Sequence, residues 1–220
     1  MSTGKSRRDQ FSEATRAALL EAATKRFATL GFAGTSLEDV AADIRATRGA
    51  VYHHFSSKKA LFEAVFEKME TEAVQRSRAA GAQGEDPWQA AILALDAFLE
   101  TCTDPVYGRV VWQEAPIACG WARWAELENE FAFGLIEEHV RTLMESGHIE
   151  RLPTDTTARI AYAMLGAAGQ ALAEASEEDK PRVREEYRLV IGHLLAGLAT
   201  ESPETASTAR QVSGRKAKTA

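Results

Sequence analysis

The sequence predicts an all-α protein of 220 residues. Apolar side chains recur at three- and four-residue spacing, as on one face of a helix, and Gly and Pro separate these periodic segments. A content of 45% hydrophobic and 26% charged residues is typical of a globular chain that can bury a core. We expect an arm at 1–12, a three-helix unit at 13–60, a helical unit at 61–200 and a tail at 201–220.

The first predicted helix covers Glu13 to Leu30. Leu19, Ala23 and Phe27 share a stripe with Leu30, and Gly31 is a good C-terminal stop. We expect this helix to act as scaffold for the two helices that follow it.

The second predicted helix begins at Thr35-Ser36-Leu37-Glu38. This order has the S/T-x-x-E form, in which a hydroxyl and a carboxylate satisfy the first free amides of a helix. Leu37, Val40, Ala41 and Ile44 then recur on one face, which predicts that this face packs inward.

A turn at Arg45-Ala46 and an N-cap hydroxyl at Thr47 predict a third, short helix. Within TRGAVYHHF, Val51 and Phe55 suit the core. The other side chains are basic, small, or aromatic with a polar tip. An Arg in the first turn can reach guanine or phosphate, small residues let the backbone approach base edges, and Tyr and His position phosphates. We interpret the two helices as a helix-turn-helix with its recognition helix in the DNA major groove; an ordinary exposed helical hairpin is the alternative.

From about Thr15 to Phe66 the chain resembles the DNA-binding domain of the TetR family of transcriptional repressors. The match covers FATLGF, GTSLEDVA and TRGAVYHHFSSKKALF. One departure is Arg45, in a turn where the family commonly has Gly and where the backbone is often left-handed, so that a non-Gly residue costs on the order of 1 kcal/mol. The resemblance implies DNA contacts at Ser36, Thr47, Arg48, Gly49, Ala50, Tyr52, His53, His54 and Lys58.

The acidic charge lies away from this motif. Of the net charge of −6, residues 1–70 contribute +2 and residues 71–200 contribute −10. DNA binding is therefore expected to depend on a local basic face and to be steeply salt-dependent. The arm at 1–12 and the tail at 201–220 are polar and expected to be disordered, although both carry basic residues that could contact DNA.

The rest of the chain is expected to form helices separated by Gly and Pro. A helix from Lys58 to Arg78 would join the two units as a lever, and residues 79–87 form the first break. The segment from Asp104 to Leu127 resembles the linker-and-helix region of one subgroup of TetR-family regulatory domains. The later helices are expected from about Asp86, after Pro105, from Trp121 to Ser146, from Pro153 to Ala175 and from Asp179 to Ala199.

Two functions are assigned to this helical half. Its aromatic side chains, with a few polar ones including His139, predict a pocket for a mostly apolar ligand with one polar or cationic end, although each aromatic could be ordinary core. The pocket candidates are Phe98, Trp112, Gln113, Glu114, Trp121, Trp124, Phe131 and Gln170. The last two helices predict a dimer interface, or alternatively an internal hairpin, through Leu165, Ala168, Leu172, Val190, Leu194 and Leu198.

These features predict a ligand-responsive, homodimeric DNA-binding transcriptional regulator, most simply a repressor released from a palindromic operator by a small effector of unknown identity. We expect no metal, cofactor or membrane partner. Without a visible signal peptide, and with only Cys102 and Cys119, the chain is expected in the cytoplasm with both thiols reduced, a redox pair being the alternative. A helical enzyme using Glu114 or His139, and an interaction module without DNA binding, stay open as other classes.

Overall fold

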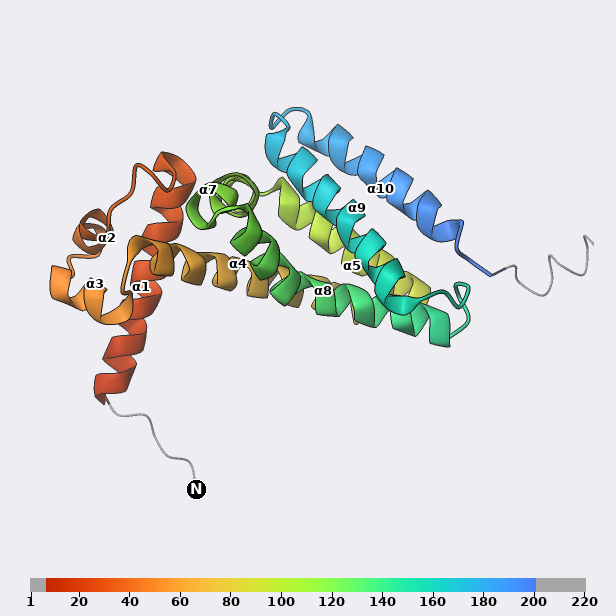
Figure 1. Ribbon diagram of the computed structural model, residues 1–220, viewed down its shortest axis with the longest axis horizontal. Helices are drawn as coiled ribbons and strands as arrows, with labels where there is room; N and C mark the ends of the chain where they lie inside the picture. The colour runs from red at the N-terminus through yellow and green to blue at the C-terminus, as the bar shows by residue number, and fades with distance from the viewer. Residues whose placement is uncertain (1–6, 201–220) are drawn as a thin grey trace, which may run out of the picture.

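The computed structural model describes residues 7–200, and its regular structure is helical, which confirms the predicted all-α class (Figure 1). In this part of the chain the β-type pairing is limited to one isolated bridge between Ile149 and Ala199. Three N-terminal helices form a head at one end of the molecule, and α4 runs from the head into a larger helical body (Figure 1). The tail at 201–220 and the first part of the arm lie outside the described residues.

The head consists of α1 (Arg7–Leu30), α2 (Leu37–Asp43) and α3 (Arg48–His54). Helix α1 begins at Arg7, inside the segment 1–12 that was expected to be a disordered arm. Leu30 is 55% exposed, so the apolar stripe of α1 ends before it. The small core of the head has the expected members: Leu19, Ala23, Phe27, Leu37, Val40, Val51 and Phe55.

The body begins with α4 (Lys58–Gly81), which is longer by its last turn than the predicted helix. Helix α4 packs along α5 and α8 and also against α1 of the head. Its first half supplies Leu61, Phe62 and Val65 to the buried core beside the head. The other body helices are α5 (Pro87–Thr103), α6 (Pro105–Tyr107), η1 (Gly108–Glu114), α7 (Ala115–Cys119), α8 (Trp121–Glu145), α9 (Thr154–Glu174) and α10 (Lys180–Ala196).

Side-chain caps explain where several of these helices start. Ser57 accepts the amide hydrogen of Ala60, and Asp86 accepts that of Gln89. Proline follows both Asp86 and Asp104 at the first helical position, where its missing N–H costs nothing. These local signals account for the agreement between the predicted and observed starts.

The segment after Pro105 differs from the single short helix that was predicted. It contains η1, a π-helix in which Trp112 packs against α9. A Cβ added at Gly169 of α9 would lie 2.2 Å from Cζ2 of Trp112, so only glycine admits the indole there. The π-helix thus packs tightly against a part of the chain that is distant in sequence.

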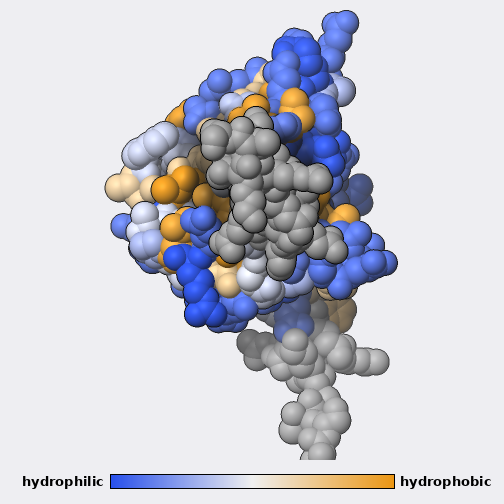
Figure 2. All heavy atoms as spheres, turned by 90° about the vertical axis from the view of Figure 1, so that its right-hand side faces the viewer, coloured by the Kyte–Doolittle hydropathy of each residue, from blue (hydrophilic) through white to orange (hydrophobic). Residues whose placement is uncertain are grey.

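The surface of the body is mainly hydrophilic, with smaller hydrophobic patches. Figure 2 shows such patches at the end of the molecule that faces right in Figure 1. No helix of residues 7–200 has the length and apolar character needed to cross a membrane.

Candidate DNA-binding face and ligand cavity

The N-cap of α2 is Ser36, one residue later than the predicted capping box. Ser36 Oγ accepts the amide hydrogen of Asp39 at 3.1 Å and donates to Asp39 Oδ2 at 2.6 Å. Thr35 is buried instead, and its hydroxyl donates to the carbonyl oxygen of Gly31 at 2.9 Å. The chain contains two overlapping matches to the cap pattern, and the burial of Thr35 leaves Ser36 as the cap.

The turn between α2 and α3 has the left-handed conformation expected at Arg45. Its φ of 55° is the one positive value at a non-glycine residue in the described part of the chain. Thr47 then caps α3 by accepting the amide hydrogen of Ala50 at 3.2 Å. The helix-turn-helix therefore forms without glycine in its turn, at a conformational cost of about 1–2 kcal/mol.

The outer face of α3 presents most of the predicted contact residues to solvent. Thr47, Arg48, Gly49, Tyr52 and His53 are exposed. Ser36, Ala50, His54 and Lys58 are half-buried.

In the free protein, Glu38 of α2 contacts Arg48 and Tyr52, the two strongest candidates for DNA contact. Its Oε1 lies 3.2 Å from Arg48 Nε and accepts a hydrogen bond from the Tyr52 hydroxyl at 3.3 Å. The Arg48 guanidinium also lies over the Tyr52 ring, 5.3 Å from its centroid. This network orients both side chains, and it must rearrange if they are to bind phosphate.

Two further candidates have environments that the sequence did not indicate. Burial, aided by the charges of His53 and Arg16, lowers the pKa of His54, so His54 is neutral near pH 7. Lys58 Nζ donates to the carbonyl oxygen of Phe32 at 2.7 Å and lies 4.4 Å from the centroid of the Phe32 ring. The free structure therefore directs Lys58 towards the loop after α1.

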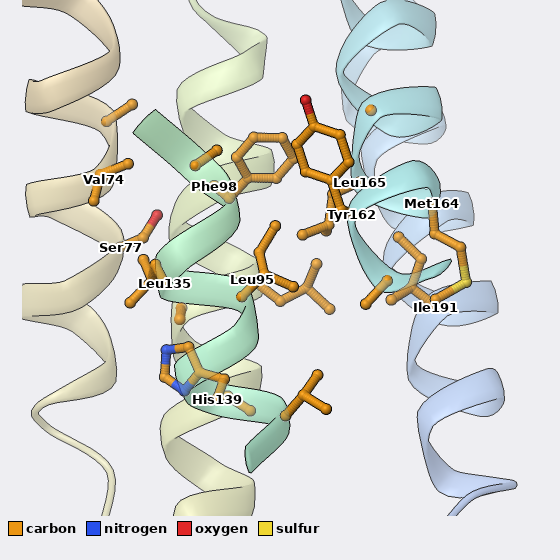
Figure 3. A pocket seen from close by; sticks show the side chains of 18 of the residues that line it. Val74, Ser77, Leu95, Phe98, Leu135, His139, Tyr162, Met164, Leu165 and Ile191 are labelled. Atoms are coloured by element: carbon orange, nitrogen blue, oxygen red, sulfur yellow. The ribbon is translucent and has the colours of Figure 1, made fainter. Parts of the chain in front are cut away.

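The body contains a partly open cavity of about 130 Å³ between α4, α5, α8, α9 and α10 (Figure 3). Most of its wall is apolar. Leu95 and Phe98 come from α5, Leu165 from α9 and Ile191 from α10. Figure 3 shows Phe98 of α5, Tyr162 of α9 and His139 of α8 among the side chains that line the cavity.

Only two of the predicted pocket candidates, Phe98 and Trp112, line this cavity, together with His139. The positions of the others correct that prediction. Trp121 is 66% exposed, and Gln170 is exposed and donates to Glu174. Gln113 donates to the carbonyl oxygen of Ala173. Trp124 packs against Trp112 and Trp121, Phe131 lies near Phe66, and Glu114 reaches the head.

The sequence analysis missed two acidic side chains in the cavity wall, Glu70 of α4 and Glu128 of α8. They are 2% and 5% exposed. Burial raises the pKa of Glu70 to about 7, and burial together with the charge of Glu70 raises the pKa of Glu128 well above its usual value. A signal was present, because each Glu continues an apolar stripe: Phe66 precedes Glu70 by four residues, and Trp124 precedes Glu128 by four.

Glu114 of η1 connects the body to the head. Its Oε2 accepts the amide hydrogen of Phe32 at 2.7 Å, and its Oε1 lies 2.6 Å from Arg109 Nη2. A Cβ added at Gly31, whose φ is +73°, would lie 3.0 Å from both carboxylate oxygens of Glu114. The glycine that ends α1 thus also makes room for this carboxylate.

The predicted dimer residues fall into two groups. Ala168 and Leu172 are fully buried within this chain and cannot contact a partner, and Leu165 lines the cavity. Leu198 packs against the smaller core cluster. Val190 and Leu194 are 56% and 51% exposed, and Leu189 of α10 and Ile160 of α9 are also more than half exposed. The apolar periodicity of α9 and α10 therefore serves an internal hairpin as well as an outer apolar face.

The other reactive residues show no catalytic arrangement in the described part of the chain. No group of three metal-binding side chains occurs within residues 7–200. Cys102 and Cys119 are free and buried, and burial raises the pKa of both thiols.

A capped helix-turn-helix with an exposed recognition helix, carried on a larger helical body, defines the class of helix-turn-helix regulators. A family model for bacterial regulatory proteins of the tetR family matches residues 19–65, and a model for a tetracyclin repressor-like C-terminal domain matches residues 88–198. The chain belongs to the TetR family. That family consists of bacterial regulatory proteins.

Two curated relatives match about a third of the chain. The regulator TtgR of Pseudomonas putida is 36% identical over 77 residues, which are 34% of this chain and 37% of that protein. A probable acrEF/envCD operon repressor of Escherichia coli is 38% identical over 77 residues, 34% of each chain. The match thus spans about a third of the length of these relatives.

Solved structures match over more of the molecule. A TetR-family transcriptional regulator from Pectobacterium atrosepticum is 29% identical and has a TM-score of 0.76, with 90% of this chain and 99% of that chain covered. The ketosteroid regulator KstR2 of Mycobacterium tuberculosis, at 20% identity and a TM-score of 0.58 over 84% of this chain and 95% of that chain, shares the fold.

Proposed function

We propose that this protein is a homodimeric transcriptional repressor that binds operator DNA through α3 and is released when a small effector fills the cavity of the body. Family membership and the exposed face of Thr47, Arg48, Tyr52 and His53 support the DNA-binding role. The operon repressor among the relatives favours repression over activation.

The observation that carries the proposal is that α4 belongs to both sites. Its first half packs Leu61 and Phe62 beside the head, and its second half presents Glu70, Val74 and Ser77 to the cavity. A ligand that contacts this half of α4 can shift the helix, and α4 transmits that shift to the head. An effector releases DNA only to the extent that it prefers the non-binding form.

A second connection runs through η1. Trp112 lines the cavity, and Glu114, two residues later, accepts the amide hydrogen of Phe32 in the head. A change in the position of Trp112 therefore acts on the end of α1 as well as on α4.

The proposed dimer uses the outer face of α9 and α10. Ile160, Leu189, Val190 and Leu194 are each more than half exposed in the single chain. A two-fold dimer would place two α3 helices about 34 Å apart, in successive major grooves of a palindromic operator.

The test is fluorescence anisotropy with DNA from upstream of the protein's own gene and with fragments from a genome-wide selection, in excess non-specific DNA at about 0.15 M salt. We expect saturable binding of nanomolar order, lost in Arg48→Ala. Arg151→Ala, at an exposed arginine of the body, is the matched control and should bind normally. Absence of specific binding to every fragment, or equal binding by Arg48→Ala, would refute the proposal.

A further inference from the structure

The cavity contains two buried acids whose charge nothing in its wall balances. Glu70 and Glu128 both line it, and its wall, drawn from residues 70–195, includes neither lysine nor arginine. Glu128 Oε1 is buried without a hydrogen-bond partner in the described structure. A buried carboxyl oxygen without a partner is costly, and proteins rarely retain one without a use.

The two acids mark one end of the cavity. Helices α4 and α8 both run from the head side of the body outwards (Figure 1), and Glu70 and Glu128 precede Ser77 and Leu135 by two turns on these helices. Tyr107 donates to Glu70 Oε1 at 2.5 Å from the same end. The cavity is therefore acidic towards the head, and away from it the wall is apolar apart from Ser77 and His139.

We propose that the cavity binds a compact organic cation, an amine whose ammonium group lies between Glu70 and Glu128 and whose apolar body contacts Leu95, Phe98 and Tyr162. This inference rests on the proposed effector role of the cavity and specifies the chemical class of the effector.

The charge and size of the cavity select this class. An anion would find no lysine or arginine in the wall to pair with, and it would oppose the ionisation of the two buried carboxyls. A hydrocarbon would leave Glu128 Oε1 without a partner, whereas an ammonium donates hydrogen bonds and neutralises the acids. The volume of 130 Å³ is close to that of an apolar cavity of about 150 Å³ that accommodates benzene. One ring with a short amine therefore fits the empty form.

Binding of a cation must release a proton from this end of the cavity. The titratable groups that face it are Glu70 of α4, Glu128 and His139 of α8, Cys102 of α5, Tyr107 of α6 and Tyr162 of α9; η1 and α10 present Trp112, Ile191 and Leu195. Burial raises the pKa of both phenols and of the thiol and lowers that of His139, so these four are neutral near pH 7.

The carboxyl groups of Glu70 and Glu128 alone then set the pH dependence of cation binding. With the pKa of Glu70 at about 7 and that of Glu128 raised well above its usual value, the empty site holds protons that a cation displaces. Cation affinity should therefore increase with pH between about pH 6 and 8. The increase should be up to about tenfold per pH unit for each proton released.

Isothermal titration calorimetry of the full chain with benzylammonium chloride tests the inference. Ethylbenzene, which replaces the ammonium by a methyl group, and benzyl alcohol are the neutral comparisons. At about pH 7.5 we expect benzylammonium to bind more tightly than either, with proton release detected in buffers of different ionisation enthalpy. Glu128→Gln and Glu70→Gln should each weaken benzylammonium on the order of 30-fold and leave ethylbenzene unchanged.

Glu130→Gln, at an exposed glutamate of the same helix α8, is the matched control and should bind benzylammonium like the unchanged protein. The inference is overturned if benzylammonium does not bind up to about 10 mM, if either neutral compound binds as tightly, or if both glutamine variants keep full affinity. These titrations contain no DNA, so their failure leaves the operator assay intact. Conversely, the absence of DNA binding in the operator assay would refute the proposed regulator function. It would not change the ligand preference measured in these titrations.

Discussion

Arg45 closes the turn of the helix-turn-helix in a conformation that favours glycine, with φ at 55°. Arg45→Gly removes the left-handed penalty but makes the unfolded chain more flexible. We expect a net gain of about 0.5–1 kcal/mol in the free energy of unfolding, measured by urea titration. Arg151→Gly, at an exposed arginine whose φ is not positive, should give a loss instead. Equal effects of the two changes would mean that the turn is unstrained.

Glu38 competes with DNA for Arg48 and Tyr52, because its Oε1 contacts both side chains in the free protein. Glu38→Gln removes this competition and also a negative charge close to the phosphates. We expect operator affinity to rise about two- to fivefold at low salt, with a smaller gain at high salt. Anisotropy titrations at two salt concentrations measure it. Glu21→Gln, in an exposed pair with Lys25 on α1, is the control and should change little. A weaker complex in Glu38→Gln would show that Glu38 instead preorganises Arg48 for binding.

At the scale of secondary-structure elements, the sequence predicted helices well where the signals for them lie close together in the chain. Apolar spacing, the caps at Ser57 and Asp86 and the stops at Gly31 and Gly147 indicated most ends of the long helices to within a few residues, but α1 begins at Arg7 and not at Glu13. The π-helix has no comparable local signal, and its Trp112 packs against Gly169, which is distant in sequence.

The residues that line the cavity were also hard to predict, because the cavity depends on tertiary packing. An aromatic residue in an apolar stripe looks identical in sequence whether it fills a core or lines a hollow. Trp124 and Phe131 fill the core, whereas Phe98 and Trp112 line the cavity. The DNA face was easier to locate, because a short helix with one apolar edge leaves few alternatives for its other side chains, although its contacts with DNA stay predictions.

The contact between η1 and the head yields a prediction at this scale. Glu114→Ala leaves the Phe32 amide and the Arg109 guanidinium without their carboxylate partner. We expect the free energy of unfolding to fall by about 2 kcal/mol, as for buried hydrogen bonds to charged groups. Denaturant titration measures the loss. Glu126→Ala, whose carboxylate contacts Arg123 on the surface of α8, should cost less than about 0.5 kcal/mol. A loss in Glu114→Ala no larger than that would mean that the contact does not hold head and body together.

For the whole molecule, the outer face of α9 and α10 sets the predicted oligomeric state. Leu194→Glu places a charge in the centre of this apolar face, and desolvating that charge in a dimer is costly. We expect light scattering after size exclusion to show the mass falling from that of a dimer to that of a monomer. Ile117→Glu, at an exposed residue of α7 that is 68% accessible, should remain dimeric. A dimer in Leu194→Glu would place the interface elsewhere.

Helix α4 gives the head and the cavity separate residues on one rigid element: Leu61, Phe62 and Val65 on the head side, and Glu70, Val74 and Ser77 around the cavity. Under the proposed function, this division suits the chain to use as a modular biosensor scaffold in protein engineering. Libraries at the cavity positions would then change which compound is detected while the promoter stays the same, and exchange of α3 side chains would redirect the output while the compound stays the same.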